Sequence, residues 1–556
     1  MIYYTPAHRR TLKLFKTPFD NTLDPENRWV RMAEVVPWDR MASVFHLSMS
    51  KSRGRGSIDL RVVMGALLVK HLQGLSDEDT VLCIQENIYV QYFVGLPCFQ
   101  KNPVFVPSLF VEIRKRLGHK GVAKLNEMMF QQAVELRAIK HRRKPSKRVK
   151  DNHQGEDGQA GGTRVKHKPS QAELFDIYPT EDAINQESLE SVNPGQELQE
   201  EPEVENRGTL KLDATVAPQH IGYPVDTKLL NQARESSEDL IDKLYTEAEL
   251  WSTKPRTYRR SARKAYLAFA KNRRPSKKQI RKAKGQQLRY LRRNLHTLDT
   301  MLELLEQQGL KPSWSALDWR RFWVLQELFR QQDIMHRDGR RQIDDRIVSV
   351  SQPYVRPIKR GKAGKDTEFG AKINVSETEG FVRIDQISFD NFNEGIYLQQ
   401  QVEGYRAFFG YYPEVVLADQ IYMNRENRNY LKERNIRHTG KPLGRPAEIS
   451  PQEKSRNRLE QNKRSEIEGK FGQGKSKYGL DNIKTRLANT SMAYIGLIFL
   501  AMNVVKLSKA LFSLLFWRIY TILQHVWDDQ FLLQYKPIIP ETIFEPYSAR
   551  YTYCHE

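Results

Sequence analysis

Two aspartates follow short apolar runs that are typical of buried strands. The run from Gly208 to Pro218 alternates apolar and polar residues and predicts a strand that ends at Asp213 or just after it. The run at 413–420 predicts a buried strand that ends at Asp419. Because ligands of α/β proteins bind at the carboxyl ends of strands, two such carboxylates are expected to share divalent cations. A single strand-ending aspartate is more often a turn or cap residue, so the pair matters more than either member.

A third acid lies in the segment RSEIEGKFGQGKSKYG. Four of its residues recur at intervals of four, three and four positions and so share one helical face: Arg464, Glu468, Phe471 and Lys475. Because Phe471 belongs to this stripe, we expect the stripe to face the protein and to enclose Glu468 in part, with Glu466 pointing about 160° away. A solvated, salt-bridged helix would explain the charges too. An enclosed carboxylate beside cations is what two-metal phosphodiester chemistry requires.

Several elements must position these acids. Runs that predict strands lie at 208–217, 346–352, 371–388 and 413–419, and helical patterns follow them, which predicts a mixed α/β sheet for the C-terminal domain. Glu379 and Gly380 predict the turn of a hairpin within 371–388. The charged stretch from Pro451 to Ser476 predicts the helix that carries Glu468.

An apolar segment, Met492 to Trp517, has to be assigned either to a membrane or to the core. Asn503, Lys506 and Lys509 interrupt it before it reaches the roughly 20 apolar residues that cross a bilayer. The two lysines lie three positions apart, on a face that a soluble helix turns to water. We therefore expect a buried core helix and no membrane span.

Composition narrows the class of protein. The chain has 556 residues, and 89 Lys and Arg against 67 Asp and Glu give a net charge of +22, which draws a protein toward polyanions such as nucleic acid or a membrane surface. Three cysteines without CxxC or Cys/His spacing argue against a disulfide-rich secreted protein and a structural zinc domain. The sequence contains no GxSxG elbow, no GxxxxGK[ST] loop, no HExxH and no GxGxxG after a strand. A cytoplasmic protein is expected.

Changes in composition divide the chain before its sheet. Residues 30–137 predict a helical N-terminal domain whose last helix starts at Ser108 and carries Arg114, Lys115 and Arg116 before Gly118, which resembles a helix-turn-helix arrangement. Residues 138–206 combine a basic stretch with an acidic one and predict a charged, disordered linker.

A basic helical segment interrupts the predicted sheet domain. Residues 228–340 predict long helices, and between Lys254 and Arg293 they carry 17 Lys or Arg and no acid. Such a density repels itself without a polyanion, so we expect this segment to hold DNA phosphates; the alternative is a helical hairpin that is merely basic. The candidate contacts are Arg259, Arg260, Arg263, Lys264, Arg273 and Arg274.

Three blocks of the sequence carry a family resemblance. LKLDATVAPQHIGYPVDTKLLNQARE, VVLADQIYMNRENRNYLKERNIR and RSEIEGKFGQGKSKYGL resemble, in order, the blocks that hold the first Asp, the second Asp and the Glu of bacterial insertion-sequence transposases of the DDE type. RGSIDLRVVMGALLVKHLQGLSDEDTVLCIQENIYVQYFVGL is similar to the helical N-terminal domain common in these proteins. In the family's Tyr, Arg, Glu, Lys pattern the Tyr position is Gln461, which is a departure.

The resemblance implies a fold, a site and an activity. It implies a ribonuclease-H-like catalytic domain at 207–227 and 341–523, with 228–340 inserted into it. It assigns Asp213, Asp419 and Glu468 as catalytic metal ligands for two Mg²⁺ ions, with Mn²⁺ as a substitute, and Arg464 and Lys475 as DNA-binding cations.

The implied protein is a cytoplasmic, nucleoid-associated transposase, a homodimer on double-stranded DNA, that binds the terminal inverted repeats of its own element, cuts there and joins the ends to target DNA. Two alternatives stay open: a non-catalytic DNA-binding regulator that uses the same basic surfaces, and a structure-selective nuclease with the same core. An intact acid triad separates the regulator from the enzymes.

Overall fold

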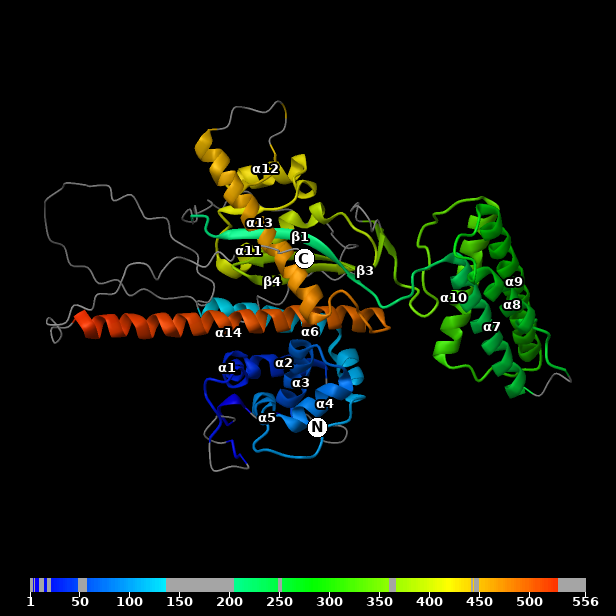
Figure 1. Cartoon of the computed structure of the whole chain (residues 1–556), viewed down its shortest axis with the longest axis horizontal. Helices are drawn as coiled ribbons and strands as arrows, with labels where there is room; N and C mark the ends of the chain where they lie inside the picture. Colours follow the sequence, from blue (N-terminus) through cyan, green and yellow to red (C-terminus); the bar gives the residue numbers. More distant parts are fainter. Residues whose placement is uncertain are drawn as a thin grey trace, which may run out of the picture.

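The computed structural model describes residues 22–48, 58–136, 205–248, 253–359, 367–441 and 450–528, together with Gly444 and short stretches before residue 22. The predicted linker at 138–206 therefore lies outside the described residues, apart from its last two. Figure 1 shows a sheet layered with helices, a group of N-terminal helices below it, and a helical bundle that stands apart at one side.

Six helices form the N-terminal group: α1 (Arg28–Val35), α2 (Trp38–Ser48), α3 (Leu60–Gln73), α4 (Asp77–Glu86), α5 (Ile88–Val94) and α6 (Leu109–Glu135). The predicted helix that starts at Ser108 ends in a kink at Gly118, whose φ of +56° is not helical, and α6 resumes beyond it. Gly118 is one of the positions that need glycine, since a side chain there would be strained.

The long helix α14 (Ala488–Asp528) joins this group to the sheet. It packs along α6, and its residues Leu497, Leu500 and Val504 belong to the same hydrophobic core as the N-terminal helices. By length and composition Ala488–Phe512 is long and apolar enough to cross a membrane, but most of that window is buried inside the protein. The prediction of a core helix is confirmed over the part whose side chains the structure describes, which ends at Phe512.

The sheet has six strands: β1 (Thr209–Pro218), β2 (Pro357–Lys359), β3 (Thr367–Thr378), β4 (Phe381–Ser388), β5 (Val415–Leu417) and β6 (Arg437–His438). The order is β2-β3-β1-β5-β6, with β4 also paired to β3. β3 is antiparallel to β1 and to β4, whereas β5 is parallel to β1 and to β6. The predicted mixed sheet is confirmed.

Helices cover both faces of the sheet. α11 (Leu398–Phe409) and α12 (Arg425–Glu433) share a core with Leu210 and Leu212 of β1. On the other face α13 (Pro451–Tyr478) and α14 share a core with β3, in which Ile467 and Phe471 are buried. Because side chains alternate along a strand, the odd-numbered residues of β1 face α13.

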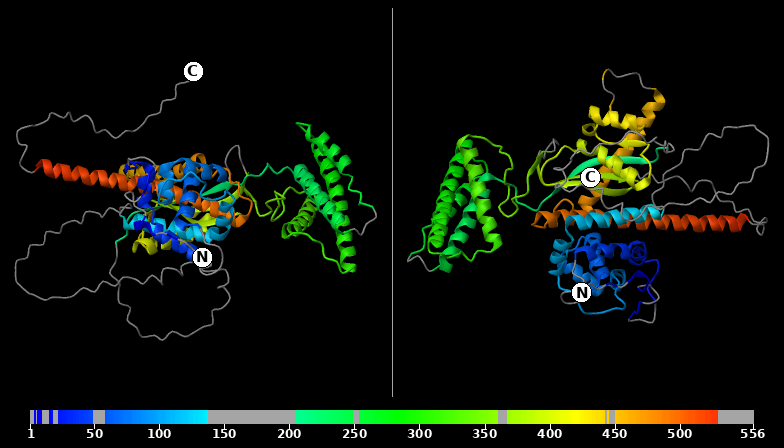
Figure 2. Two further views of the ribbon diagram at one scale, coloured as in Figure 1. Left: turned by 90° about the horizontal axis from the view of Figure 1, so that it is seen from below. Right: turned by 180° about the vertical axis from the view of Figure 1, so that it is seen from behind.

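The basic segment forms the separate bundle, from α7 (Asp226–Ala248), α8 (Arg259–Ala270), α9 (Lys277–Gln307) and α10 (Ala316–Arg337). Leucines of α7, α9 and α10 build its own hydrophobic core. Figure 2 shows from two further sides that this bundle is joined to the rest of the molecule by extended segments. We call α7–α10 the insertion.

Two strand predictions need correction. β1 does not end at Asp213 but continues to Pro218, because β3 pairs with it over its whole length from Lys211 onward. Residues 346–352 form no strand; they belong to the extended connection that leads from α10 back to β2. The hairpin is confirmed, with Glu379 and Gly380 at φ of +49° and +89° between β3 and β4.

Candidate active site

The pairing register places Asp213 beside Asp419. Lys211 of β1 lies opposite Leu417, the last residue of β5, so the two aspartates follow at the same height on adjacent parallel chains. Because adjacent strands lie about 4.8 Å apart, the two carboxylates lie near each other at the end of β5. Asp213 thus lies in the middle of β1, but at the point where β5 stops pairing with it. Asp419 follows shortly after the end of β5, as the sequence predicts, whereas Asp213 lies within its strand.

Arg464 of α13 joins two of the three predicted acids. Its Nη1 lies 2.7 Å from Oδ1 of Asp419, an ion pair whose angles do not make a hydrogen bond, and its Nη2 lies 3.4 Å from Oε1 of Glu468. The Arg464 side chain is 13% exposed, whereas those of Asp419 and Glu468 are 54% and 56% exposed. A largely buried guanidinium therefore holds two carboxylates that solvent still reaches.

The exposure of Glu468 corrects one expectation. Its carboxylate is not enclosed, because the buried stripe of α13 runs through Ile467, Phe471 and Gly474, and Glu468 lies about 100° to one side of it. Glu466 flanks the same stripe on the other side, so it also reaches the sheet and does not point away from it.

The pKa of Asp213 is shifted by burial and by the charges of its neighbours. Burial raises the pKa of Asp213 to about 6, with Asp419 and Glu468 acting in the same direction; the hydrogen bond from the Ala214 amide and the charge of Arg464 oppose them. The Ala214 amide donates to Oδ1 of Asp213 at 2.8 Å. A partly buried carboxyl group crowded by like charges is one that a cation would stabilise.

The donor chemistry of the site suits a hard divalent cation. Asp213, Asp419 and Glu468 offer the carboxylate oxygens that Mg²⁺ prefers. Within the described residues, however, no three His, Cys, Asp or Glu side chains are grouped closely enough to hold a metal ion as they stand. Arg464 supplies the positive charge between Asp419 and Glu468 in this arrangement.

A buried lysine next to the site escaped the sequence analysis. Nζ of Lys211 lies 2.6 Å from Oε2 of Glu377 and donates to Oε2 of Glu466 at 2.5 Å, so it ties β3 and α13 to β1. Burial works to lower the pKa of Lys211, but Glu377 and Glu466 outweigh it and raise that pKa. The available signal was a lysine in an apolar strand two residues before Asp213, and hence on the same face.

A buried hydrogen bond between Tyr422 and Asn374, which the sequence did not predict, supports the turn that follows Asp419. Tyr422, which follows Asp419 in a short 3-10 helix, is fully buried and donates from its hydroxyl to Oδ1 of Asn374 in β3 at 2.6 Å. Burial raises the pKa of Tyr422, and the charge of Asp213 acts in the same direction. This hydrogen bond fixes the turn that carries Asp419 to the central strands.

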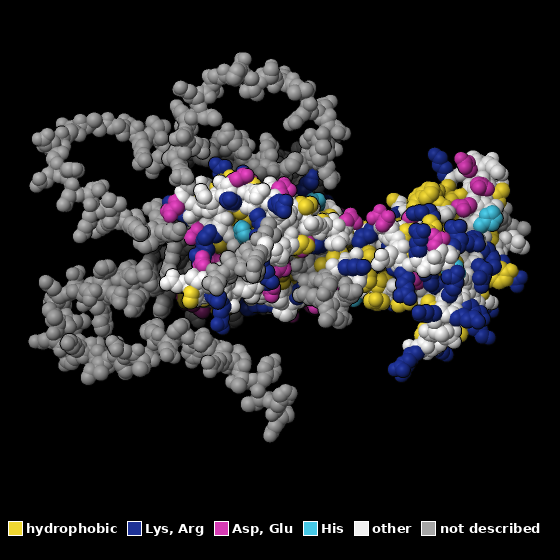
Figure 3. Space-filling view, turned by 90° about the horizontal axis from the view of Figure 1, so that it is seen from above, with side chains coloured by type: hydrophobic (Ala, Val, Ile, Leu, Met, Phe, Trp, Pro, Cys, Tyr) yellow, Lys and Arg dark blue, Asp and Glu magenta, His cyan; other side chains and the backbone are white. Residues whose placement is uncertain are grey.

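The predicted DNA-binding cations fall into two groups. Lys475 lies two turns beyond Glu468 on α13 and is partly buried. Of the cations predicted in the insertion, five are exposed: Arg260, Arg263 and Lys264 on α8, and Arg273 and Arg274 before α9. Figure 3 shows Lys and Arg side chains gathered over the insertion.

Arg259 and Arg114 have internal partners. Arg259 makes a two-pronged contact with Asp242 of α7, at 2.6 and 3.0 Å, and so ties α8 to α7. Arg114 of the predicted helix-turn-helix is buried and holds Asp77 in the same way, at 2.8 and 2.9 Å. Both guanidinium groups are thus held by carboxylates, although the Arg259 side chain is 43% exposed and that of Arg114 only 7%.

Two family models match separate segments of the chain. Residues 17–116 match the family model of a transposase domain (DUF772), and residues 416–505 match that of a transposase DDE domain. The second match spans Asp419, Arg464 and Glu468 but not β1 and Asp213.

The chain is also similar to an uncharacterized protein, ORF8 in the nfe locus of Rhizobium meliloti, with 32% identity over 122 residues. That alignment covers 22% of this chain and 58% of the relative. No solved structure matches the chain. Two segments of the chain thus match transposase domain models, and its resemblance to the DDE transposases of bacterial insertion sequences is confirmed.

Proposed function

We propose that this chain is a metal-dependent DNA transposase in which Asp213, Asp419 and Glu468 act as the catalytic carboxylates. The observation that carries the proposal is that Asp419 and Glu468 both pair with Arg464, and that the charges of these two carboxylates help to raise the pKa of Asp213. The match to a transposase DDE domain over 416–505 supports it. The order and direction of the strands support a ribonuclease-H-like sheet.

The three carboxylates would hold two divalent cations, Mg²⁺ or Mn²⁺. Such cations, when bound, activate a water molecule or a 3′-hydroxyl and stabilise the leaving oxygen in phosphodiester cleavage. The chain's own residues orient this site: Lys211 fixes α13 against β1, and the Tyr422 hydroxyl fixes the turn of Asp419. Arg464 holds Asp419 and Glu468 near each other until DNA phosphates and metal compete for these groups.

The other regions would bind double-stranded DNA. Exposed cations of the insertion would contact phosphates, and the N-terminal helices would contribute to recognition of the terminal inverted repeats. Cleavage at the ends, strand transfer into target DNA, assembly as a homodimer on DNA and residence at the cytoplasmic nucleoid complete the proposal.

A second candidate function is a DNA-binding regulator without catalysis. The observation that favours it is that Arg464 already pairs with both Asp419 and Glu468, and that no group of three metal ligands stands assembled among the described residues. A regulator needs the basic insertion but not the acids. Substitution of the acids therefore separates the two functions.

The test uses purified full-length protein and a supercoiled plasmid that carries the gene with its native flanking DNA, in the presence of Mg²⁺. The transposase proposal predicts cuts at the element ends, and a loss of cleavage by about 100-fold or more in Asp213→Asn, Asp419→Asn and Glu468→Gln while plasmid binding persists. Glu303→Gln, an exposed acid on α9, is the matched control and should cut normally. Binding without any cleavage would favour the regulator.

A further inference from the structure

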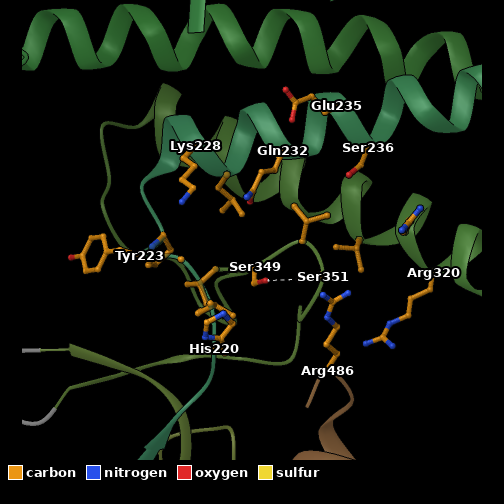
Figure 4. A pocket seen from close by; sticks show the side chains of 18 of the residues that line it. His220, Tyr223, Lys228, Gln232, Glu235, Ser236, Arg320, Ser349, Ser351 and Arg486 are labelled. Atoms are coloured by element: carbon orange, nitrogen blue, oxygen red, sulfur yellow. Dashed lines mark hydrogen bonds between the residues drawn. The ribbon is translucent and has the colours of Figure 1, made fainter. Parts of the chain in front are cut away.

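A cavity of about 560 Å³ lies where the insertion meets the sheet domain. Its walls come from α7 and α10 of the insertion, from the two connecting segments at 220–225 and 348–351, and from the loop before α14. Figure 4 shows the side chains that line it. The cavity therefore belongs to neither domain alone.

Three cations surround this cavity from three different elements. Lys228 of α7 points into it from one side and Arg486 of the loop before α14 from the other, and Arg320 of α10 completes the lining (Figure 4). All three side chains are exposed. Within the described part of the chain, none of the three forms an ion pair with a carboxylate. Positive charges that converge without a counter-ion repel one another, so an anion in the cavity would stabilise them.

The acids that line the cavity leave its charge positive. Glu235 points away from the space in Figure 4 and pairs with Arg234 at 3.1 Å, and Asp239 is the second acid of the lining. A fourth cation of the lining, Arg321, lies 3.8 Å from Asp318. Cations thus outnumber the acids that could balance them.

The wall that carries Arg486 is fixed to the strand that carries Asp213. His220, two residues beyond β1, donates its amide to the Ile483 carbonyl at 2.9 Å, and its Nδ1 lies 2.9 Å from Oδ1 of Asn482. Gln219 and Ile483 form a parallel bridge at the same place. Asp213 and His220 are seven residue steps apart along extended chain, which spans roughly 23 Å.

We infer that this cavity binds the phosphate backbone of DNA where the duplex passes from the catalytic sheet to the insertion. The inference rests on the proposed function. A span of roughly 23 Å corresponds to about seven nucleotide steps of 3.4 Å along one strand, so one duplex reaches both places. DNA in the cavity contacts Lys228 and Arg320 from the insertion and Arg486 from the sheet domain, and so fixes the orientation of the insertion.

The test measures binding of the full chain to a labelled duplex at several salt concentrations. In the triple variant Lys228→Gln, Arg320→Gln, Arg486→Gln the slope of log affinity against log salt should shrink by roughly 2.7, since each lost phosphate contact removes about 0.9. The matched control is Asp239→Asn, which removes a negative charge from the same cavity and should tighten binding. A mere disturbance of structure would weaken binding in both variants.

Three outcomes would overturn the inference. An unchanged salt slope in the triple variant, with wild-type cleavage intact, would remove the cavity from the DNA path and leave the proposed function standing. Inorganic phosphate that binds the wild type and not the triple variant, with duplex binding equal in both, would assign the cavity to a free phosphate compound. A wild-type protein that binds no duplex at all would overturn the proposed function as well.

Discussion

The sheet domain and the insertion use charge in opposite ways. At the sheet, Lys211 is buried between Glu377 and Glu466, and Arg464 lies between Asp419 and Glu468. Over α8 and the start of α9, by contrast, cations stand exposed to solvent.

The difference follows from solvation. A buried charge is costly unless it is paired, so charges at the sheet come in pairs that fix elements to one another. Exposed charges cost little and attract a polyanion over a distance. The comparison therefore predicts that substitutions at the sheet change stability, whereas those in the insertion change DNA affinity.

Lys211→Met should give the largest effect. It leaves the carboxylate of Glu377, whose side chain is 1% exposed, buried without its cation, and should lower the free energy of unfolding by about 3 kcal/mol or more. Chemical denaturation followed by circular dichroism measures it. The double variant Lys211→Met, Glu377→Gln should recover much of the loss, because the amide carries no charge; a double variant as unstable as the single one would contradict the role of this pair.

The pH dependence of stability should depend on His71 of α3. Burial, followed by the charges of Lys70 and Arg114, lowers the pKa of His71 to about 3, and its ring packs against Tyr494 of α14. Because the unfolded chain takes up this proton near pH 6.5 and the folded chain does not, stability falls as the pH drops from 7.5 to 5, by about 2 kcal/mol. In His71→Phe that part of the pH dependence should disappear. Equal pH dependence in both proteins would show that His71 is not buried as a neutral ring.

Glu466→Gln should have a small effect on stability. The Glu466 side chain is 60% exposed and Lys211 keeps Glu377, so the loss should stay below about 1 kcal/mol. Thermal unfolding of this variant beside Lys211→Met measures the difference. A loss as large as that of Lys211→Met would mean that the exposed contact between Lys211 and Glu466, and not the buried contact between Lys211 and Glu377, dominates the stability.

Replacing Arg260, Arg263, Lys264 and Arg273 together by Gln should leave the free energy of unfolding within about 0.5 kcal/mol, since all four are exposed. Affinity should fall for all DNA sequences alike, and the salt slope should shrink by roughly 3.6. Arg259→Gln is the contrast within the same helix. Because Arg259 is held by Asp242, this substitution should change stability more than DNA affinity. Loss of preference for one sequence only would instead assign the segment to base recognition.

The sequence was sufficient for elements whose signals are local. The strand before Asp419, the hairpin at Glu379 and Gly380, and the charged helix from Pro451 all follow from periodicity, turn residues and capping, and all are present. The spacing of Arg464 and Glu468 also predicts that they share a helical face, and the two side chains form an ion pair.

What the sequence could not predict depends on partners distant in the chain. The length of β1 is set by β3, more than 150 residues away, so Asp213 lies within a strand that local pattern alone would end there. The orientation of α13 is set by Ile467 and Phe471 together, which places Glu466 and Glu468 on both flanks of the packed face. The pairing of Lys211 depends on both effects and was missed for that reason.

Divalent-metal binding by the three acids is tested most directly with Mn²⁺, by electron paramagnetic resonance on the full chain. The wild type should bind Mn²⁺, Asp213→Asn, Asp419→Asn and Glu468→Gln should each weaken binding about tenfold or more, and Glu303→Gln should bind like the wild type. Equal binding in all five proteins would contradict the claim that these three carboxylates form one metal site.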